Sequence, residues 1–229
     1  MARQPGAITA YLELHIEQGG QLEAMGRAIG IVEGIVGIRR YAATFRGVAN
    51  HAGTTPMAGR ADALVMAAPF VESVRRVAIA HHLVGTVGTM LVEPNAPNVI
   101  PGLVRLGLEL RGLDEMCLAA AAEELGQLAL ARGASFEEQS RKAPVRCSPR
   151  LMDLVAAAAQ SLALPHMTMA SGAGHDAMCM AALGPVAMIF VPSIGGVSHA
   201  PGEETLPEQC IAGTHVLLAT ILALDGASS

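Results

Sequence analysis

The chain opens with a strict alternation of hydrophobic and polar positions. In the segment LELHIEQGG (12–20) every second residue is apolar, and Glu13, His15 and Glu17 fill the positions between. A period of two is typical of a half-buried strand, and the two glycines that follow predict a turn. The pattern therefore puts a histidine on the polar face of a strand, with a carboxylate two residues away on each side. Such a histidine is either hydrogen-bonded at a strand end or a metal ligand with acidic neighbours.

The middle of the chain carries a second, longer pattern. Period-two segments alternate there with segments whose apolar residues recur at helical spacing. The resulting order, β-α-β-β-α-β, is that of a ferredoxin-like fold, one antiparallel sheet with two helices on one face. The predicted strands are 39–47, 85–92, 103–111 and a short one near ASFEEQS, and the predicted helices are 61–80 and about 115–132.

The last third of the chain changes pattern again. A helix is predicted at about 149–163, a glycine loop opens a short helix in SGAGHDAMCMAALG, and PVAMIFVP (185–192) has the continuous apolar character of a strand buried on both faces. A final helix is predicted from a capping box at Thr205 to about 223. This is the pattern of an α/β domain, and it matches the opening strand. We therefore expect a catalytic-type α/β domain in two pieces, 1–37 and 141–229, interrupted by a separate domain at 38–140.

Composition narrows the function classes. Hydrophobic residues make up 52% of the 229 residues and charged residues 15%, so the chain either packs unusually densely or has a partner surface that covers part of its apolar area. The net charge is −5 and no basic run occurs, which argues against nucleic acid as a partner. The N-terminus shows no apolar leader and no long uncharged apolar stretch predicts a membrane span. The four cysteines lack CxxC spacing, so we expect buried thiols in a cytoplasmic protein.

Six motifs occur in one order along nearly the whole chain: ELHIEQG, NHAGTTPM, APNVIPG, LELRGLD, SGAGHDA and GGVSHAPGEE. Together they resemble the hydantoinase/carbamoylase branch of the M20 metallopeptidase-like amidohydrolases, which includes N-carbamoyl-L-amino acid hydrolases, allantoate amidohydrolases and β-ureidopropionases. The resemblance implies a binuclear-metal enzyme that cleaves a linear carbamoyl or ureido C–N bond of a small carboxylate-bearing substrate. It also implies that the inserted domain is a lid through which two subunits form a homodimer.

The resemblance assigns three histidines to the chemistry. His15 and His199 match metal-binding histidines, and neutral imidazole is a good ligand for zinc, manganese, nickel or cobalt. His51 matches a lid histidine that polarises the scissile carbonyl, in this family in the neighbouring subunit's site. Without the motifs, His199 would be a solvated loop histidine and His51 a turn histidine.

The resemblance also assigns the substrate contacts. Arg111 matches the arginine that grips the α-carboxylate, and Asn98 a substrate-binding asparagine. Arg39 matches a further substrate arginine, with Arg40 beside it unassigned. The alternatives are a solvated sheet arginine for Arg111, a turn asparagine for Asn98 and a helix N-cap for Asp176. The remaining residues expected to lie at the pocket are Gln18, His175 and Asp176.

The sequence departs from the family pattern in one respect. The H-x-D motif, the bridging aspartate and the Glu-Glu pair that supply the other ligands and the general base are not found in matching positions. The motifs present correspond to the C-terminal half of the family's pattern. We therefore expect this chain alone to bind divalent metal weakly or not at all and to lack turnover. The alternative to an enzyme is a truncated, non-catalytic remnant that dimerises through the lid.

Overall fold

The computed structural model describes residues 4–226, which divide into two compact units. The first unit contains residues up to 36 and from 145 onward, and the second contains residues 37–144. The elements of the first unit are β1 (Tyr11–Ile16), α1 (Gln21–Ala24), β2 (Ile29–Ile35), β7 (Val145–Arg146), α4 (Pro149–Ser161), β8 (His166–Ser171), α5 (Ala177–Met180), β9 (Val186–Val191), a 3-10 turn at Ile194–Gly196 and α6 (Pro207–Gly226).

The first unit is a mixed sheet with helices on both faces. Strand β1 runs parallel to β9, β9 runs antiparallel to β2, and β2 pairs with β8 in parallel and with the short β7 at its end. On one face, α4 and α6 cover a core that includes Ile31, Val155 and Val216. On the other, α1 and α5 cover a core that includes Leu22 and Phe190. Every residue of β9 is buried, which confirms the prediction of a strand enclosed on both faces.

Three local features of this unit differ from the sequence expectation. Strands β2 and β8 were not predicted, because β2 is buried on both faces and interrupted by glycines, so it shows no alternation. The capping box at Thr205 is also absent. The Thr205 hydroxyl instead donates to the Pro192 carbonyl at 2.9 Å, and α6 begins at Pro207.

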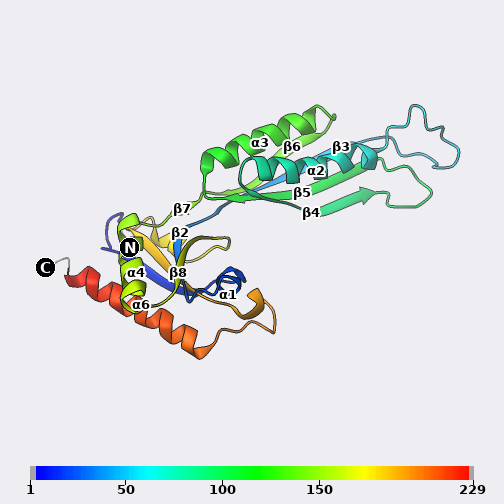
Figure 1. Cartoon of the computed structure of the whole chain (residues 1–229). Coiled ribbons are helices and arrows are strands. Elements are labelled where there is room, and N and C mark those ends of the chain that lie inside the picture. The colour runs from blue at the N-terminus through cyan, green and yellow to red at the C-terminus, as the bar shows by residue number, and fades with distance from the viewer. Residues whose placement is uncertain (1–3, 227–229) are drawn as a thin grey trace. The chain divides into compact units, whose positions relative to one another are not determined.

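The second unit has the ferredoxin-like topology that the sequence predicts (Figure 1). Its elements are β3 (Gly37–Arg46), α2 (Ala63–Ala80), β4 (Val84–Glu93), β5 (Leu103–Gly112), α3 (Glu115–Leu130) and β6 (Ser135–Lys142). The sheet is antiparallel in the order β4-β5-β3-β6, and α2 and α3 cover one face of it. Both helices begin at an aspartate, Asp62 or Asp114, whose carboxylate accepts two backbone N–H groups of the first turn.

The two faces of this sheet have different characters. Along β5, the even-numbered residues from Val104 to Leu110 are buried against the helices together with Phe45 and Phe70. The odd-numbered residues, which include Arg105, Glu109 and Arg111, point to the face that carries no helix. We call this surface of the second unit the open face. Period-two alternation therefore sorts the charged residues of β5 onto one surface.

Helix α6 is the longest apolar helix. It has 20 residues and a mean hydropathy of 1.3 over its most apolar window, long and apolar enough to cross a membrane by length and composition. One such helix is weak evidence, and α6 packs against the sheet through Gly213, Val216 and Thr220. A Cβ on Gly213 would lie 2.6 Å from Val191 Cγ1, so the helix approaches β9 closely.

The cysteines only partly match the expectation of buried thiols. All four are free, but Cys179 and Cys210 are exposed and Cys117 is half-buried. Cys147 is buried, and this burial raises the pKa of its thiol to about 11. The structure therefore contains one thiol of the kind expected.

Candidate metal centre and substrate-binding residues

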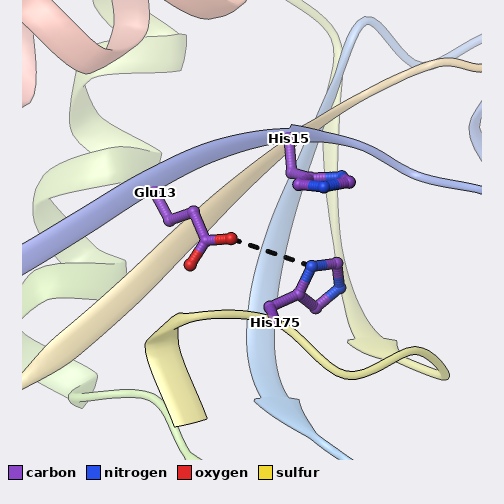
Figure 2. A group of neighbouring side chains, drawn as sticks. All are labelled: Glu13, His15 and His175. Carbon is purple, nitrogen blue, oxygen red and sulfur yellow. Dashed lines mark ion pairs between the residues drawn. The ribbon is translucent and has the colours of Figure 1, made fainter. Parts of the chain in front are cut away.

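Three potential metal ligands converge in the first unit. Glu13 and His15 lie two residues apart on the same face of β1, and His175 comes from the loop between β8 and α5. One ligand atom from each of the three lies within 4.8 Å of the others (Figure 2). The rings of His15 and His175 meet edge to face, with centroids 4.6 Å apart. Strand β1 thus supplies two donors, and the segment leading into α5 supplies the third.

The backbone fixes which nitrogen of His15 can bind a cation. His15 Nδ1 lies 2.8 Å from the carbonyl oxygen of Ile16, which can only accept a hydrogen bond. Nδ1 therefore carries the proton and donates it to this carbonyl. The lone pair is left on Nε2, the arrangement common in metal-binding histidines.

The surroundings of His175 fix its protonation in the same way. Its Nε2 lies 2.7 Å from Ser171 Oγ, and the single hydroxyl proton of that serine is donated to the carbonyl of Ala173 at 3.0 Å. His175 Nε2–H therefore donates to Ser171, which leaves the lone pair on Nδ1, the atom 3.8 Å from Glu13 Oε1. Burial and, second, the charge of His15 lower the pKa of His175 to about 4, so the ring is neutral at pH 7.

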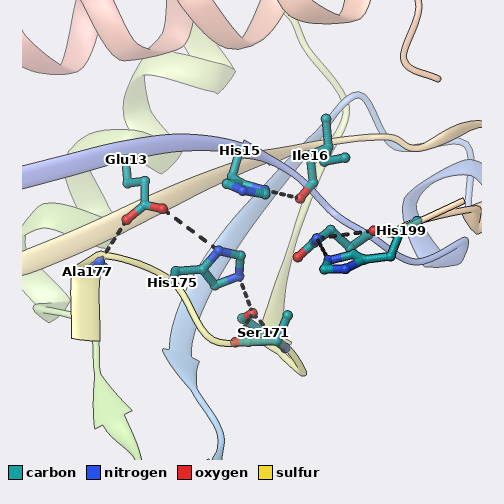
Figure 3. A network of polar contacts seen from close by, with 10 residues as sticks. Glu13, His15, Ile16, Ser171, His175, Ala177 and His199 are labelled. Atoms are coloured by element: carbon teal, nitrogen blue, oxygen red, sulfur yellow. Dashed lines mark hydrogen bonds and ion pairs between the residues drawn. The ribbon is translucent and has the colours of Figure 1, made fainter. Parts of the chain in front are cut away.

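Glu13 has a second contact that holds it in place. Its Oε2 accepts a hydrogen bond of 2.8 Å from the backbone N–H of Ala177, at the start of α5 (Figure 3). Asp176 occupies the N-cap position of α5, but its side chain makes no capping hydrogen bond. The carboxylate of β1 therefore performs the capping that the sequence suggested for Asp176.

The donor set suits a divalent cation. A carboxylate oxygen and two neutral imidazoles with free lone pairs form a mixed O/N site of the kind that zinc and manganese occupy in proteins. The alternation in β1 could have indicated Glu13, because it lies on the same face as His15. The role of His175 as the third member could not be predicted from spacing, because His175 lies far from Glu13 and His15 along the chain. The sequence analysis placed it among the substrate contacts instead.

His199, the second predicted ligand, lies outside this cluster. Its Nε2 accepts from the Gln18 amide nitrogen at 3.1 Å, and the same nitrogen donates to Ser198 Oγ (Figure 3). Both Gln18 and His199 have positive φ angles, 60° and 57°, which are rare for residues other than glycine. Glu203 accepts from the His199 N–H and the Ser198 hydroxyl, and these bonds lower the pKa of its carboxyl.

Gln18 borders a hollow of about 390 Å³ in the first unit. The hollow lies between the loop that follows β1 and the end of β8, and its other lining residues include Glu17, Met169 and Ala173. Glu17 itself accepts the backbone N–H groups of Gln21 and Leu22 at 2.8 Å each, so its carboxylate is occupied with the start of α1. This leaves Gln18 as the polar side chain that connects the hollow to the His199 loop.

In the second unit, the structure brings His51 and Asn98 together. His51 forms an isolated β-bridge with Val99, and the Asn98 carbonyl accepts from the N–H of Ala52 at 2.9 Å. His51 Nδ1 accepts from the backbone N–H groups of Gly53 and Thr54 at 3.0 and 3.2 Å. The proton of the neutral ring is therefore on Nε2, which leaves the exposed His51 a hydrogen-bond donor.

The two neighbouring arginines of β3 lie on opposite faces of its sheet. Arg39 is only 5% exposed, faces the helices and pairs with Glu115 at 2.6 Å. Arg40, to which the sequence assigned no role, lies on the open face with Arg111. The role of Arg39 as a substrate contact stays a prediction, and in this structure its guanidinium lies against Glu115 at the start of α3. Glu115 also pairs with Arg141, and this network leaves Arg39 Nε buried without a partner.

Arg111 and Arg40 share one carboxylate. Arg111 Nε lies 2.5 Å from Glu109 Oε1, and Arg40 Nε lies 2.7 Å from Glu109 Oε2. Partial burial raises the pKa of Glu109, but the two guanidiniums outweigh it and hold this pKa below its ordinary value. Glu109 is therefore ionised and holds both arginines at the same place on the open face.

Comparison with known proteins shows the family. Residues 1–223 match peptidase family M20/M25/M40, and the chain belongs to it. The resemblance to its hydantoinase/carbamoylase branch is confirmed. The chain is 41% identical to an N-carbamoyl-L-amino-acid amidohydrolase of Paenarthrobacter aurescens, with 98% of the chain and 56% of that protein covered. It is 38% identical to an allantoate amidohydrolase of Bacillus subtilis (strain 168), with 92% and 53% covered.

Solved structures show the same relationship. A hydantoinase/carbamoylase family amidase from Burkholderia multivorans is 40% identical and superimposes with a TM-score of 0.87, over 95% of this chain and 55% of that one. A protein described as AtUAH, solved in complex with (S)-hydroxyglycine, is 34% identical with a TM-score of 0.77, over 96% of this chain and 55% of its own. The chain thus spans about half the length of the relatives it matches.

Proposed function

We propose that this chain is part of a metal-dependent amidohydrolase of the N-carbamoyl-L-amino acid hydrolase type. The substrate would be a small carboxylate that carries a linear carbamoyl or ureido group, and the reaction the hydrolysis of its C–N bond. The observation that carries the proposal is the convergence of Glu13, His15 and His175, with one ligand atom from each within 4.8 Å of the others. The names of the relatives support the substrate class, and the hydroxyglycine bound by one solved relative is itself a small carboxylate.

The described residues supply distinct parts of such a reaction. Glu13, His15 and His175 would hold a divalent cation, which would supply an activated water and polarise the carbonyl when bound. His51 Nε2–H is a donor suited to the negative charge that develops on the carbonyl oxygen. Arg111 is proposed to bind the α-carboxylate, and Asn98 and Gln18 to orient the polar groups of the substrate.

A second copy of the chain is proposed to complete the site, through the lid domain at 38–140. His51 lies beside Val99, before β5 begins at Leu103, whereas Arg111 lies eight residues further along that strand. Eight residues of an antiparallel strand span about 27 Å, more than one small substrate can bridge. This separation supports an arrangement in which His51 and Asn98 act on a substrate held by a different subunit's Arg111.

The candidate alternative is a non-catalytic protein that dimerises through the same domain. The chain alone is proposed to bind metal weakly and to lack turnover, because a two-metal site needs a bridging carboxylate, and neither that carboxylate nor the family's general base is found in a matching position of the sequence. Metal-reloaded chain is therefore expected to leave N-carbamoyl-L-amino acids intact. Measurable hydrolysis by the chain alone would contradict this part of the proposal.

The test of the function is a fusion protein. The part of the Geobacillus stearothermophilus N-carbamoyl-L-amino acid amidohydrolase that this chain does not match, 44% of that protein, would be joined to this chain. With zinc or manganese, the fusion is expected to release free amino acid from N-carbamoyl-L-amino acids. Arg111→Ala should lower kcat/KM, because it removes a charge-assisted contact. The decrease should correspond to a loss of roughly 2–4 kcal/mol in the free energy of transition-state binding.

The matched control is Arg75→Ala, which removes an arginine exposed on α2. It should leave kcat/KM unchanged. A folded, metal-loaded fusion without turnover would favour the non-catalytic alternative, and equal activity of Arg111→Ala and Arg75→Ala would remove Arg111 from the site.

A further inference from the structure

One hollow of the second unit lies on the open face of its sheet. It is a trough of about 600 Å³ that crosses β3, β4 and β5. Its lining includes the cross-strand pair of Ala42 and Gly107 at the floor, and Gly88 of β4. A Cβ on Gly107 would lie 2.4 Å from Thr89 Oγ1, so only glycine keeps the floor this low. The trough is therefore formed by small residues at the centre of the sheet.

Arginines stand at both ends of this trough. Arg40 and Arg111 lie at one end, and both pair with Glu109. Arg105 lies toward the other end, on the same face of β5, six residues or about 20 Å along the strand from Arg111. Glu109 is the one carboxylate among the described residues that line the trough, against three guanidiniums.

Arg105 differs from the other two arginines. Its side chain is exposed and forms no ion pair or hydrogen bond with any residue that the structure describes. A guanidinium on a hollow without a carboxylate beside it attracts an anion, and attraction at an exposed position is modest. Because arginines line the trough at both ends, it can take a small molecule with an anionic group at each end.

We propose that this trough selects dicarboxylates, with Arg105 as the residue that binds the second, distal carboxylate. The substrates favoured would then be carbamoyl derivatives of acidic amino acids. The inference rests on the proposed function, since it takes Arg111 as the residue that binds the α-carboxylate. Arg105 is a specificity-determining residue in this account and has no part in bond cleavage.

The test compares two probes of equal shape on the full 229-residue chain. N-carbamoyl-L-glutamate has a distal carboxylate, and N-carbamoyl-L-glutamine has an uncharged amide in its place. Both are titrated at low ionic strength, where exposed charges are screened least, while the arginine Nε–Hε signals of ¹⁵N-labelled protein are followed by NMR. The glutamate derivative is expected to bind about three- to fivefold more tightly and to shift the Arg105 signal, which the glutamine derivative leaves in place.

Two variants separate this proposal from the proposed function. Arg105→Gln should abolish the preference for the glutamate derivative and leave binding of the glutamine derivative unchanged, whereas Arg75→Gln should preserve the preference. Equal affinities of the two probes in the wild-type chain, no binding of the glutamate derivative, or a preference that survives Arg105→Gln would overturn the dicarboxylate site. Arg111→Gln tests the proposed function separately, because it should weaken both probes alike.

Discussion

His175 is a buried neutral histidine, and its burial links stability to pH. Its side chain is 1% exposed, and its pKa falls from 6.5 to about 4 in the folded chain. The unfolded chain therefore binds a proton first as the pH falls, so the stability present above pH 6.5 is lost toward pH 4. In metal-free protein we expect a loss on the order of 3 kcal/mol across this window, measured by urea unfolding. His175→Gln should flatten the decline, whereas exposed His215→Gln should not. If the stability of His175→Gln fell with pH as steeply as that of the wild type, His175 would not be the residue responsible for the decline.

Arg39 and Arg40 are neighbours with opposite expected roles. Arg39→Gln breaks a largely buried ion pair with Glu115 and should destabilise the chain by about 2 kcal/mol, less than a fully buried pair because Glu115 is 39% exposed. Arg40→Gln removes a half-exposed arginine of the open face and should cost under about 0.5 kcal/mol. Urea unfolding of both variants checks this. Equal losses would show that β3 does not sort the two arginines onto different faces.

At the scale of elements, strands and helices whose apolar residues recur with a regular period could be predicted from the sequence. Elements without such a period could not. The second unit was predictable because its central strands β3 and β5 each have one buried and one open face, and its two helices follow capping aspartates. Strand β2 is enclosed on both faces, so no period marks it. The ligand cluster was half-predictable: Glu13 and His15 share a face of β1, but His175 reaches them only through long-range packing of the loop after β8. Spacing cannot encode such a contact.

Helix α6 offers a test of how the first unit packs. Its Gly213 faces Val191 and Leu14 so closely that an added Cβ would lie 2.6 and 2.7 Å from their methyl groups. Gly213→Val should therefore push the helix away from the sheet and cost about 1–3 kcal/mol of unfolding free energy. Thr214→Val, one residue away and exposed, is the matched control and should change little. If Gly213→Val were as stable as the control, α6 would not be a packed helix of this unit.

At the scale of the whole molecule, the account predicts a homodimer. Strand β4 is an edge of its sheet and exposes Val84, Met90 and Leu91, a long apolar edge that a second chain can cover. Sedimentation equilibrium of the full chain at tens of micromolar protein should give twice the chain mass of 23.5 kDa. A Val84→Lys, Leu91→Lys double variant should sediment as a monomer, because charges on an edge strand oppose pairing. A monomeric wild-type chain would remove the dimer from the account.

The most direct test of the account is metal binding at Glu13, His15 and His175. Chelator-stripped protein would be dialysed to equilibrium against Zn²⁺ or Mn²⁺, and the bound metal would be measured by mass spectrometry. The account predicts about one weakly bound ion per chain, with affinity at least about tenfold lower in Glu13→Gln and His175→Gln. His215→Gln, the same change at an exposed histidine of α6, should bind as the wild type does. No bound ion at saturating metal, or binding lost in His215→Gln and kept in Glu13→Gln and His175→Gln, would contradict the central claim.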